Sequence, residues 1–112
     1  MTRKELFIAY LRHYSDKDIA KISDMLAEGI RLRDWKISVL GKATAIAETE
    51  KNFNSVDTIE IDILHIYESE QTVTGELRIV VDKTETLHVV DIITFNENNK
   101  IESIRAYLGR SD

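Results

Sequence analysis

The chain has 112 residues, of which 20 are acidic and 15 are basic, so its formal net charge is −5. This length suits one domain with one hydrophobic core, and the acidic excess argues against nucleic acid, whose phosphates require clustered basic residues. The chain has no cysteine, which excludes disulfides, thiol catalysis and cysteine-ligated metals. We therefore expect a single domain over residues 1–112.

The first residues of the chain show the spacing of helices. Thr2 and Glu5 form the Thr-x-x-Glu pattern of a capping box. The apolar residues that follow recur on one helical face, at Leu6, Phe7, Tyr10, Leu11 and Tyr14. Ser15 and Asp18 repeat the capping pattern more weakly before a second apolar stripe, and Gly29 stands where we expect the left-handed cap that ends this second helix.

Two short extended segments and a third helix follow in the chain. We expect strands over residues 30–35 and 36–39, after which Gly41 interrupts the pattern. The third helix is predicted to end near residues 52–54, and its apolar positions are Ala43, Ile46, Ala47 and Phe53.

The second half of the chain alternates between apolar and polar residues, as half-buried strands do. Four strands are predicted from Ile59 onward, separated by a hairpin loop at 68–71, a tight connection at 83–84 and a turn at 97–100. The order of elements predicts an α+β fold, in which three N-terminal helices pack on one face of a curved, mostly antiparallel sheet.

The predicted strand over residues 86–95 carries a charge on an apolar face. Asp91 shares its parity with Leu87, Val89, Ile93 and Phe95. A buried carboxyl group is either protonated, with a raised pKa, or held by hydrogen-bond donors, and such groups are candidates for a functional site. The opposite face of this strand is also fairly apolar, so we expect a second copy of the chain to cover it in a homodimer.

Asp34 and Tyr10 also stand at positions where apolar residues are expected. Asp34 shares the parity of Ile30 and Leu32, and Tyr10 lies on the apolar stripe of the first helix. A buried tyrosine hydroxyl normally has a hydrogen-bond partner. Each residue also has an ordinary structural reading, because tyrosine often fills a core and aspartate at the end of a strand often caps a turn.

With these features the chain resembles the nuclear transport factor 2-like superfamily, which includes SnoaL-like polyketide cyclases and ketosteroid isomerase. Residues 10–34 are similar to the first two helices and first strand of the family. The segment VVDIITFNENNKIESIRAYLG, residues 89–109, resembles its ending, in which a hydrophobic strand and a polar turn precede a K-I-x-x-I-x-x-Y pattern. The resemblance covers nearly the whole chain and implies a cone-shaped fold with an internal pocket, whereas function varies widely within one fold.

The resemblance also implies roles for three residues that match the ketosteroid isomerase site. Asp34 would be the general base, and Tyr10 and a neutral Asp91 would donate hydrogen bonds to an enolate oxygen in a dry cavity. The implied function is a cofactor-free and metal-free acid–base reaction on a small apolar carbonyl compound. Isomerisation is the specific expectation, with cyclisation and dehydration as related reactions.

Further residues are expected to line the pocket, and some of them depart from the family pattern. Trp35 follows the expected base, where the family often has proline, so a smaller or flatter compound is as plausible a substrate as a steroid. His65 shares the parity of Ile59, Ile61 and Ile63, although a core or rim histidine is the more common reading. The expected lining residues are Tyr14, Trp35, His65, Val89 and Ile93.

Two other functions remain open on the sequence alone. The same fold can serve as a non-catalytic ligand-binding or dimerisation module, or as a protein–protein adaptor with a large exposed apolar patch. The N-terminus lacks the apolar core of a signal peptide, and no segment approaches the 18 apolar residues of a membrane span. We therefore expect a cytoplasmic protein that has no membrane partner.

Overall fold

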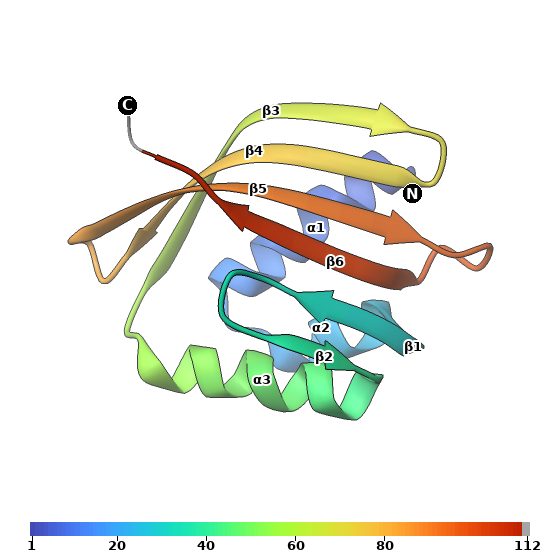
Figure 1. The fold of residues 1–112 in the computed structure, drawn as a ribbon, viewed down its shortest axis with the longest axis horizontal. Helices are drawn as coiled ribbons and strands as arrows, with labels where there is room; N and C mark the ends of the chain where they lie inside the picture. The colour runs from blue at the N-terminus through green and yellow to red at the C-terminus, as the bar shows by residue number, and fades with distance from the viewer. Residues whose placement is uncertain (111–112) are drawn as a thin grey trace.

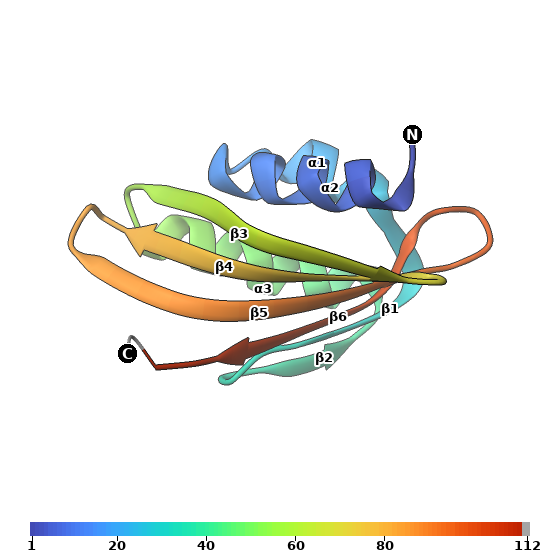
Figure 2. The ribbon, with the colours of Figure 1, turned by 90° about the horizontal axis from the view of Figure 1, so that it is seen from above.

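Three helices lie on one face of a curved six-stranded sheet (Figures 1 and 2), which confirms the predicted α+β architecture. The computed structural model describes residues 1–110. The helices are α1 (Arg3–Ser15), α2 (Ile19–Met25) and α3 (Lys42–Ser55). The strands are β1 (Leu26–Arg33), β2 (Ser38–Leu40), β3 (Ile59–Ser69), β4 (Thr72–Val81), β5 (Glu85–Phe95) and β6 (Ile101–Leu108). Their order is β2-β1-β6-β5-β4-β3, and β1 and β6 pair in parallel.

The helix starts follow the sequence pattern only in part. The capping box of α1 is confirmed, because the Thr2 hydroxyl accepts a hydrogen bond from the Glu5 amide at 3.1 Å and the Glu5 carboxylate accepts one from the Thr2 amide at 2.8 Å. The prediction of a second capping box at Ser15 and Asp18 is wrong. Asp18 caps α2 on its own, while Ser15 ends α1 and donates to the Leu11 carbonyl at 3.2 Å.

The end of α2 also differs from the prediction. Gly29 is no helix cap, because α2 ends at Met25 and the chain passes directly into β1, which contains Gly29. Pairing of Leu26 with Ile101 of β6 begins the strand four residues earlier than expected. No helix within residues 1–110 is long and apolar enough to cross a membrane.

The buried face of α3 is shifted from the predicted one. Its buried residues are Ala45, Thr49 and Phe53, whereas Ala43 and Ala47 are exposed. This buried stripe is hard to recognise in the sequence because its middle residue, Thr49, is polar. Its hydroxyl is satisfied within the helix, because it donates to the Ala45 carbonyl at 2.8 Å.

The core between the helices and the sheet depends on close contact between α1 and β4. Gly75 on β4 leaves room for the fully buried Phe7, and a Cβ added at Gly75 would stand 2.5 Å from Phe7 Cζ. We expect Gly75→Ala to lower the free energy of unfolding by about 1–3 kcal/mol, as overpacking does. Urea denaturation measures the change. Gly29→Ala is the control, because nothing lies within 4 Å of its added Cβ, and equal losses in both variants would contradict this reading.

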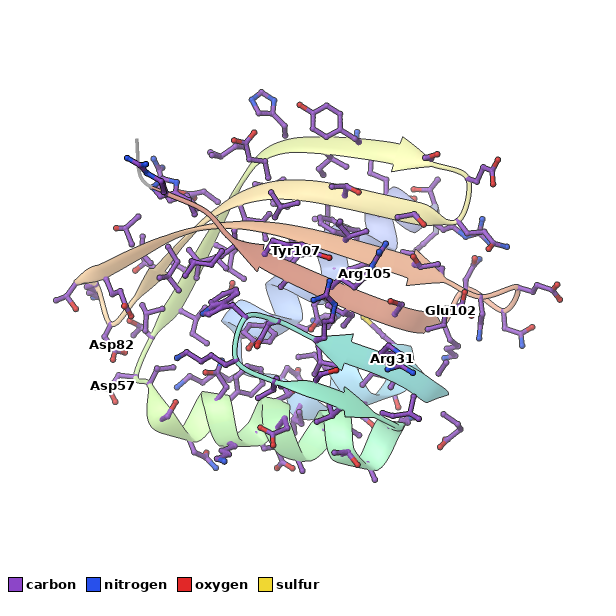
Figure 3. The ribbon with its side chains drawn as sticks, in the orientation of Figure 1. Arg31, Asp57, Asp82, Glu102, Arg105 and Tyr107 are labelled. Atoms are coloured by element: carbon purple, nitrogen blue, oxygen red, sulfur yellow. The ribbon has the colours of Figure 1, made fainter. Side chains whose placement is uncertain are left out.

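The outer face of the sheet, away from the helices, combines apolar and charged side chains. β6 and β1 present Arg105 and Arg31 on this face (Figure 3), and β4 presents Glu76 on the other side of β5. β5 contributes the half-buried Val90 and Ile92 between them. β4 also presents Arg78 on this face, ion-paired with Asp62 of β3 at 2.7 Å. A face with charges of both signs around an apolar centre can pair with itself across a twofold axis. We therefore propose that the protein forms a homodimer through this face.

The dimer is tested by changing the centre of this face. Sedimentation equilibrium at micromolar concentration should give twice the 12.9 kDa of the chain, and Ile92→Arg should shift the protein to monomer by placing an unpaired charge in the interface. Ala47→Arg, on the exposed side of α3, should leave the dimer unchanged. A monomeric wild-type protein would contradict the proposal.

Candidate active site

A cavity of about 470 Å³ is lined by residues of α1, α3, the turn between β1 and β2, and the end of the sheet at the hairpin that joins β4 to β5. Figure 1 shows where these elements lie in the fold. This volume lies in the range of small-molecule sites, which are mainly apolar with a few polar groups. The apolar lining residues are Leu32, Trp35, Ile37, Val56, Ile59, Ile79, Val81 and Leu87. The polar ones are Tyr10, Tyr14, Asp34, Lys36, Glu48, Thr49, Lys51, Asn52, Ser55 and Glu85.

Two buried polar groups at this end of the core lack a partner. Tyr10 lines the cavity and is 4% exposed, and Asp91 is 9% exposed. Neither side chain makes a hydrogen bond within residues 1–110, and neither has its oxygen atoms fully enclosed, as Thr58 Oγ1 is. Because buried polar groups are normally satisfied, these two are suited to bind an oxygen atom of a ligand.

Two small residues flank Asp91 in the sheet, and the ring of Phe7 packs over one of them, Gly75. In register with it lie Gly75 on β4 and Ala106 on β6, so neither neighbour places more than a methyl group beside the carboxyl group. Asp91 lies beyond the wall that β5 contributes to the cavity through Glu85 and Leu87. The Asp91 carboxyl group therefore lies on the inner face, as strand parity predicts, but deeper in the molecule than the cavity wall.

Burial changes the protonation of both groups. Desolvation, with a smaller contribution from the negative charge of Asp34, raises the pKa of Asp91 to about 7. Burial also raises the pKa of Tyr10 well above its ordinary value, and the charges of Tyr14 and Asp91 add to that increase. The tyrosine is protonated at neutral pH, and the aspartic acid keeps its proton at pH values below about 7. In these protonated forms each group can donate a hydrogen bond.

Asp34 lies in the cavity wall and also holds a turn. Its Oδ1 accepts hydrogen bonds from the amides of Lys36 at 2.7 Å and Ile37 at 2.9 Å, and its own amide donates to the Ile37 carbonyl at 3.0 Å. These bonds end β1 at Arg33, before the expected Trp35, and β2 begins at Ser38. Oδ2 makes no hydrogen bond within the described chain. Asp34 therefore has the turn role that its position predicted and keeps one oxygen free.

Tyr14 and its partner complete the polar wall. Asn52 Nδ2 donates a hydrogen bond to Tyr14 Oη at 2.6 Å. The Tyr14 ring lies edge-on to Phe53, with 4.8 Å between ring centroids, and 6.0 Å from the Tyr10 ring. Burial raises the pKa of Tyr14 to about 12. Sequence reasoning missed Asn52, because an exposed polar residue near a helix end has no distinguishing pattern.

The structure corrects the prediction for His65. β3 has a bulge between Ile63, which pairs with Leu77, and His65, which pairs with Glu76. The extra residue reverses the parity, so His65 is exposed and lies outside the cavity wall. It stacks on Tyr67 with 6.3 Å between ring centroids.

The other predicted lining residues divide between the cavity and the core. Tyr14 and Trp35 line the cavity, and Trp35 is 41% exposed. Val89 and Ile93 are buried on the inner face, as their parity predicted, but neither lines the cavity. The cavity lies at the start of β5, whereas these two residues stand further along the strand. No group of three or more candidate ligands that could hold a metal ion occurs within residues 1–110.

Comparison with protein families gives one match. The family model of the SnoaL-like domain matches residues 7–104 of the chain. No protein of curated function matches the sequence.

Solved structures with the same fold share little sequence with this chain. A nuclear transport factor 2-like protein of unknown function from Cytophaga hutchinsonii is 13% identical, with a TM-score of 0.82 and coverage of 97% of this chain and 91% of that one. An epoxide hydrolase/cyclase-like enzyme of pyran ring formation in salinomycin is 21% identical, with a TM-score of 0.83 and coverage of 98% and 92%. A candidate ketosteroid isomerase from Kribbella flavida is 11% identical, with a TM-score of 0.85 and coverage of 98% and 79%.

Proposed function

The chain belongs to the SnoaL-like domain family, and on this premise we propose that it is a cofactor-free acid–base enzyme acting on a small apolar carbonyl compound. The reaction begins with removal of a proton from the carbon next to the carbonyl group. One observation carries the proposal: the Tyr10 hydroxyl, which lines the cavity, and the Asp91 carboxyl group, which lies behind the cavity wall and acts on Tyr10 electrostatically, are buried without a hydrogen-bond partner in the described chain.

Each of the three residues has a defined task in this step. Asp34 accepts the proton through Oδ2, while its Oδ1 stays bound to the two turn amides. Tyr10 and protonated Asp91 donate hydrogen bonds to the carbonyl oxygen, which gains negative charge as the enolate forms. Donors that are already placed in a site of low dielectric stabilise such a charge strongly. Return of the proton to another carbon completes an isomerisation. Attack of the enolate on a second carbonyl carbon of the same molecule breaks the π bond of that carbonyl group, and the resulting alkoxide takes the proton from Asp34 to complete a cyclisation.

A second candidate function is binding without conversion. It is favoured by the two hydrogen bonds that Asp34 accepts from the turn, since these give the residue a structural role that requires no chemistry. Tyr10 and Asp91 would then hold a carbonyl or hydroxyl oxygen of a ligand that leaves unchanged. The two functions share the donor pair and differ in whether Asp34 takes a proton.

The donor pair is tested with substituted phenols, which mimic an enolate oxygen. We expect binding that strengthens as the phenol becomes more acidic, because preorganised donors favour developing negative charge. Tyr10→Phe should weaken binding about 10- to 100-fold, the effect of losing a hydrogen bond to a charged oxygen. Isothermal titration calorimetry measures the affinities, with Tyr67→Phe on the exposed surface of β3 as the control. Equal affinities for both variants would overturn the proposed donor role.

A further inference from the structure

The two tyrosines of α1 form one polar row at the cavity. Tyr10 and Tyr14 are four residues apart, so both lie on the same helical face, and both line the cavity. No hydrogen bond joins their phenol oxygens within residues 1–110. The Tyr14 oxygen instead accepts a bond from Asn52 Nδ2 at 2.6 Å.

This bond restricts the direction of the Tyr14 hydroxyl hydrogen. A phenol hydroxyl both accepts and donates, and here the amide of Asn52 fills the accepting side. The hydrogen of Tyr14 therefore cannot be directed at that amide nitrogen. The carboxyl groups of Asp34 and Asp91 act on Tyr14 electrostatically, but neither accepts a hydrogen bond from it in the described chain. The hydrogen is left for an acceptor in the cavity.

The same segment of α3 fixes both ends of the Tyr14 side chain. Phe53 packs against the ring, with an interplanar angle of 75° and centroids 4.8 Å apart. Its neighbour Asn52 holds the hydroxyl group. A donor whose ring and oxygen are both held loses little conformational freedom when it binds a ligand.

We propose that Tyr14 is a further catalytic residue, a third hydrogen-bond donor to the substrate, and that Asn52 is the positioning residue that keeps its hydrogen turned toward the cavity. This inference rests on the proposed function, because the ligand oxygen that Tyr14 meets is the one held by Tyr10 and Asp91 or a second oxygen of the same compound.

The test measures the affinity of 2-naphthol, a fluorescent enolate mimic, by titration. Tyr14→Phe should weaken binding about tenfold, as expected for one lost hydrogen bond to an oxygen with negative charge. Asn52→Asp should cause a similar loss, because its carboxylate accepts the Tyr14 hydrogen and turns it away from the cavity. Asn52→Leu, which removes the amide without adding charge, should cause a smaller loss. Asn54→Asp, on an exposed part of the same helix, controls for the added charge and should leave binding unchanged.

A double-mutant cycle separates positioning from direct contact. In the Tyr14→Phe background, each Asn52 substitution should change affinity by less than about twofold, because its effect acts through the absent hydroxyl. A loss that persists there would overturn the positioning role. Unchanged binding in Tyr14→Phe, together with weakened binding in Tyr10→Phe, would overturn the inference and leave the proposed function standing. Failure of the wild-type protein to bind 2-naphthol would overturn both.

Discussion

Raising the pH from 5 to 8 should destabilise the wild-type protein relative to its Asp91→Asn variant. The pKa of Asp91 is raised from 3.8 in ordinary surroundings to about 7 in the folded protein. Between these values the folded chain keeps a proton that the unfolded chain has lost, so stability falls as the pH rises. The contribution is complete below about pH 4 and is lost once the pH passes 7. The loss should reach on the order of 2–4 kcal/mol, since one pKa unit corresponds to about 1.4 kcal/mol.

Chemical denaturation at several pH values measures this effect. The asparagine side chain of the variant does not titrate, whereas the three histidines and the other carboxylates are common to both proteins, so the difference between the two stability curves isolates Asp91. We expect the difference to be small at pH 5 and to favour the variant at pH 8. A flat difference, or one of opposite sign, would show that Asp91 is ionised in the folded protein at neutral pH.

The ionisation of Asp91 should also change the affinity for ligands. Phenol binding by the wild-type protein should weaken above pH 7, because ionised Asp91 can no longer donate a hydrogen bond and repels a negative oxygen. Tyr10 and Tyr14 stay protonated through this range, since burial raises the pKa of both. Asp91→Asn retains a donor that does not ionise, and its affinity should depend less on pH in this interval.

Strand parity predicted the inward position of Asp91 because β5 has no bulge between Leu87 and Ile93, so its residues alternate regularly between the two faces. The same rule failed for His65, where the bulge after Ile63 inserts one residue and reverses the faces. Alternating polarity carries no signal for such an insertion, since Leu64 and His65 fit either register.

Other differences arise where tertiary contacts outweigh local pattern. Gly29 fits a helix cap in the sequence, but pairing of Leu26 with β6 turns this segment into strand. Val89 and Ile93 lie on the inner face, as their parity predicts, but the cavity does not extend as far along β5 as these two residues, which therefore pack in the core. The hydrogen bond from Asn52 to Tyr14 joins residues 38 positions apart, so only the folded chain reveals it.

Asp34→Asn should abolish proton transfer while keeping the fold. Its Oδ1 accepts bonds from the amides of Lys36 and Ile37, and the amide oxygen of asparagine can accept the same two bonds. The substitution therefore preserves the turn and removes only the base. We expect the rate at which the protein exchanges hydrogen for deuterium beside a ketone carbonyl group to fall about 10²- to 10⁴-fold, the usual contribution of a positioned general base.

The measurement needs no knowledge of the natural substrate. Deuterium incorporation from D₂O into 2-tetralone, a small apolar ketone with acidic hydrogens beside its carbonyl group, is followed by NMR. Asp57→Asn is the matched control, because Asp57 is an exposed carboxylate next to the lining residue Val56. Loss of exchange in Asp34→Asn alone, with phenol binding retained, identifies Asp34 as the base. If wild type and Asp34→Asn exchange at equal rates, then Asp34 serves only the turn. If both also exchange no faster than buffer alone and still bind phenols, the protein is a binding module that holds its ligand through Tyr10 and Asp91.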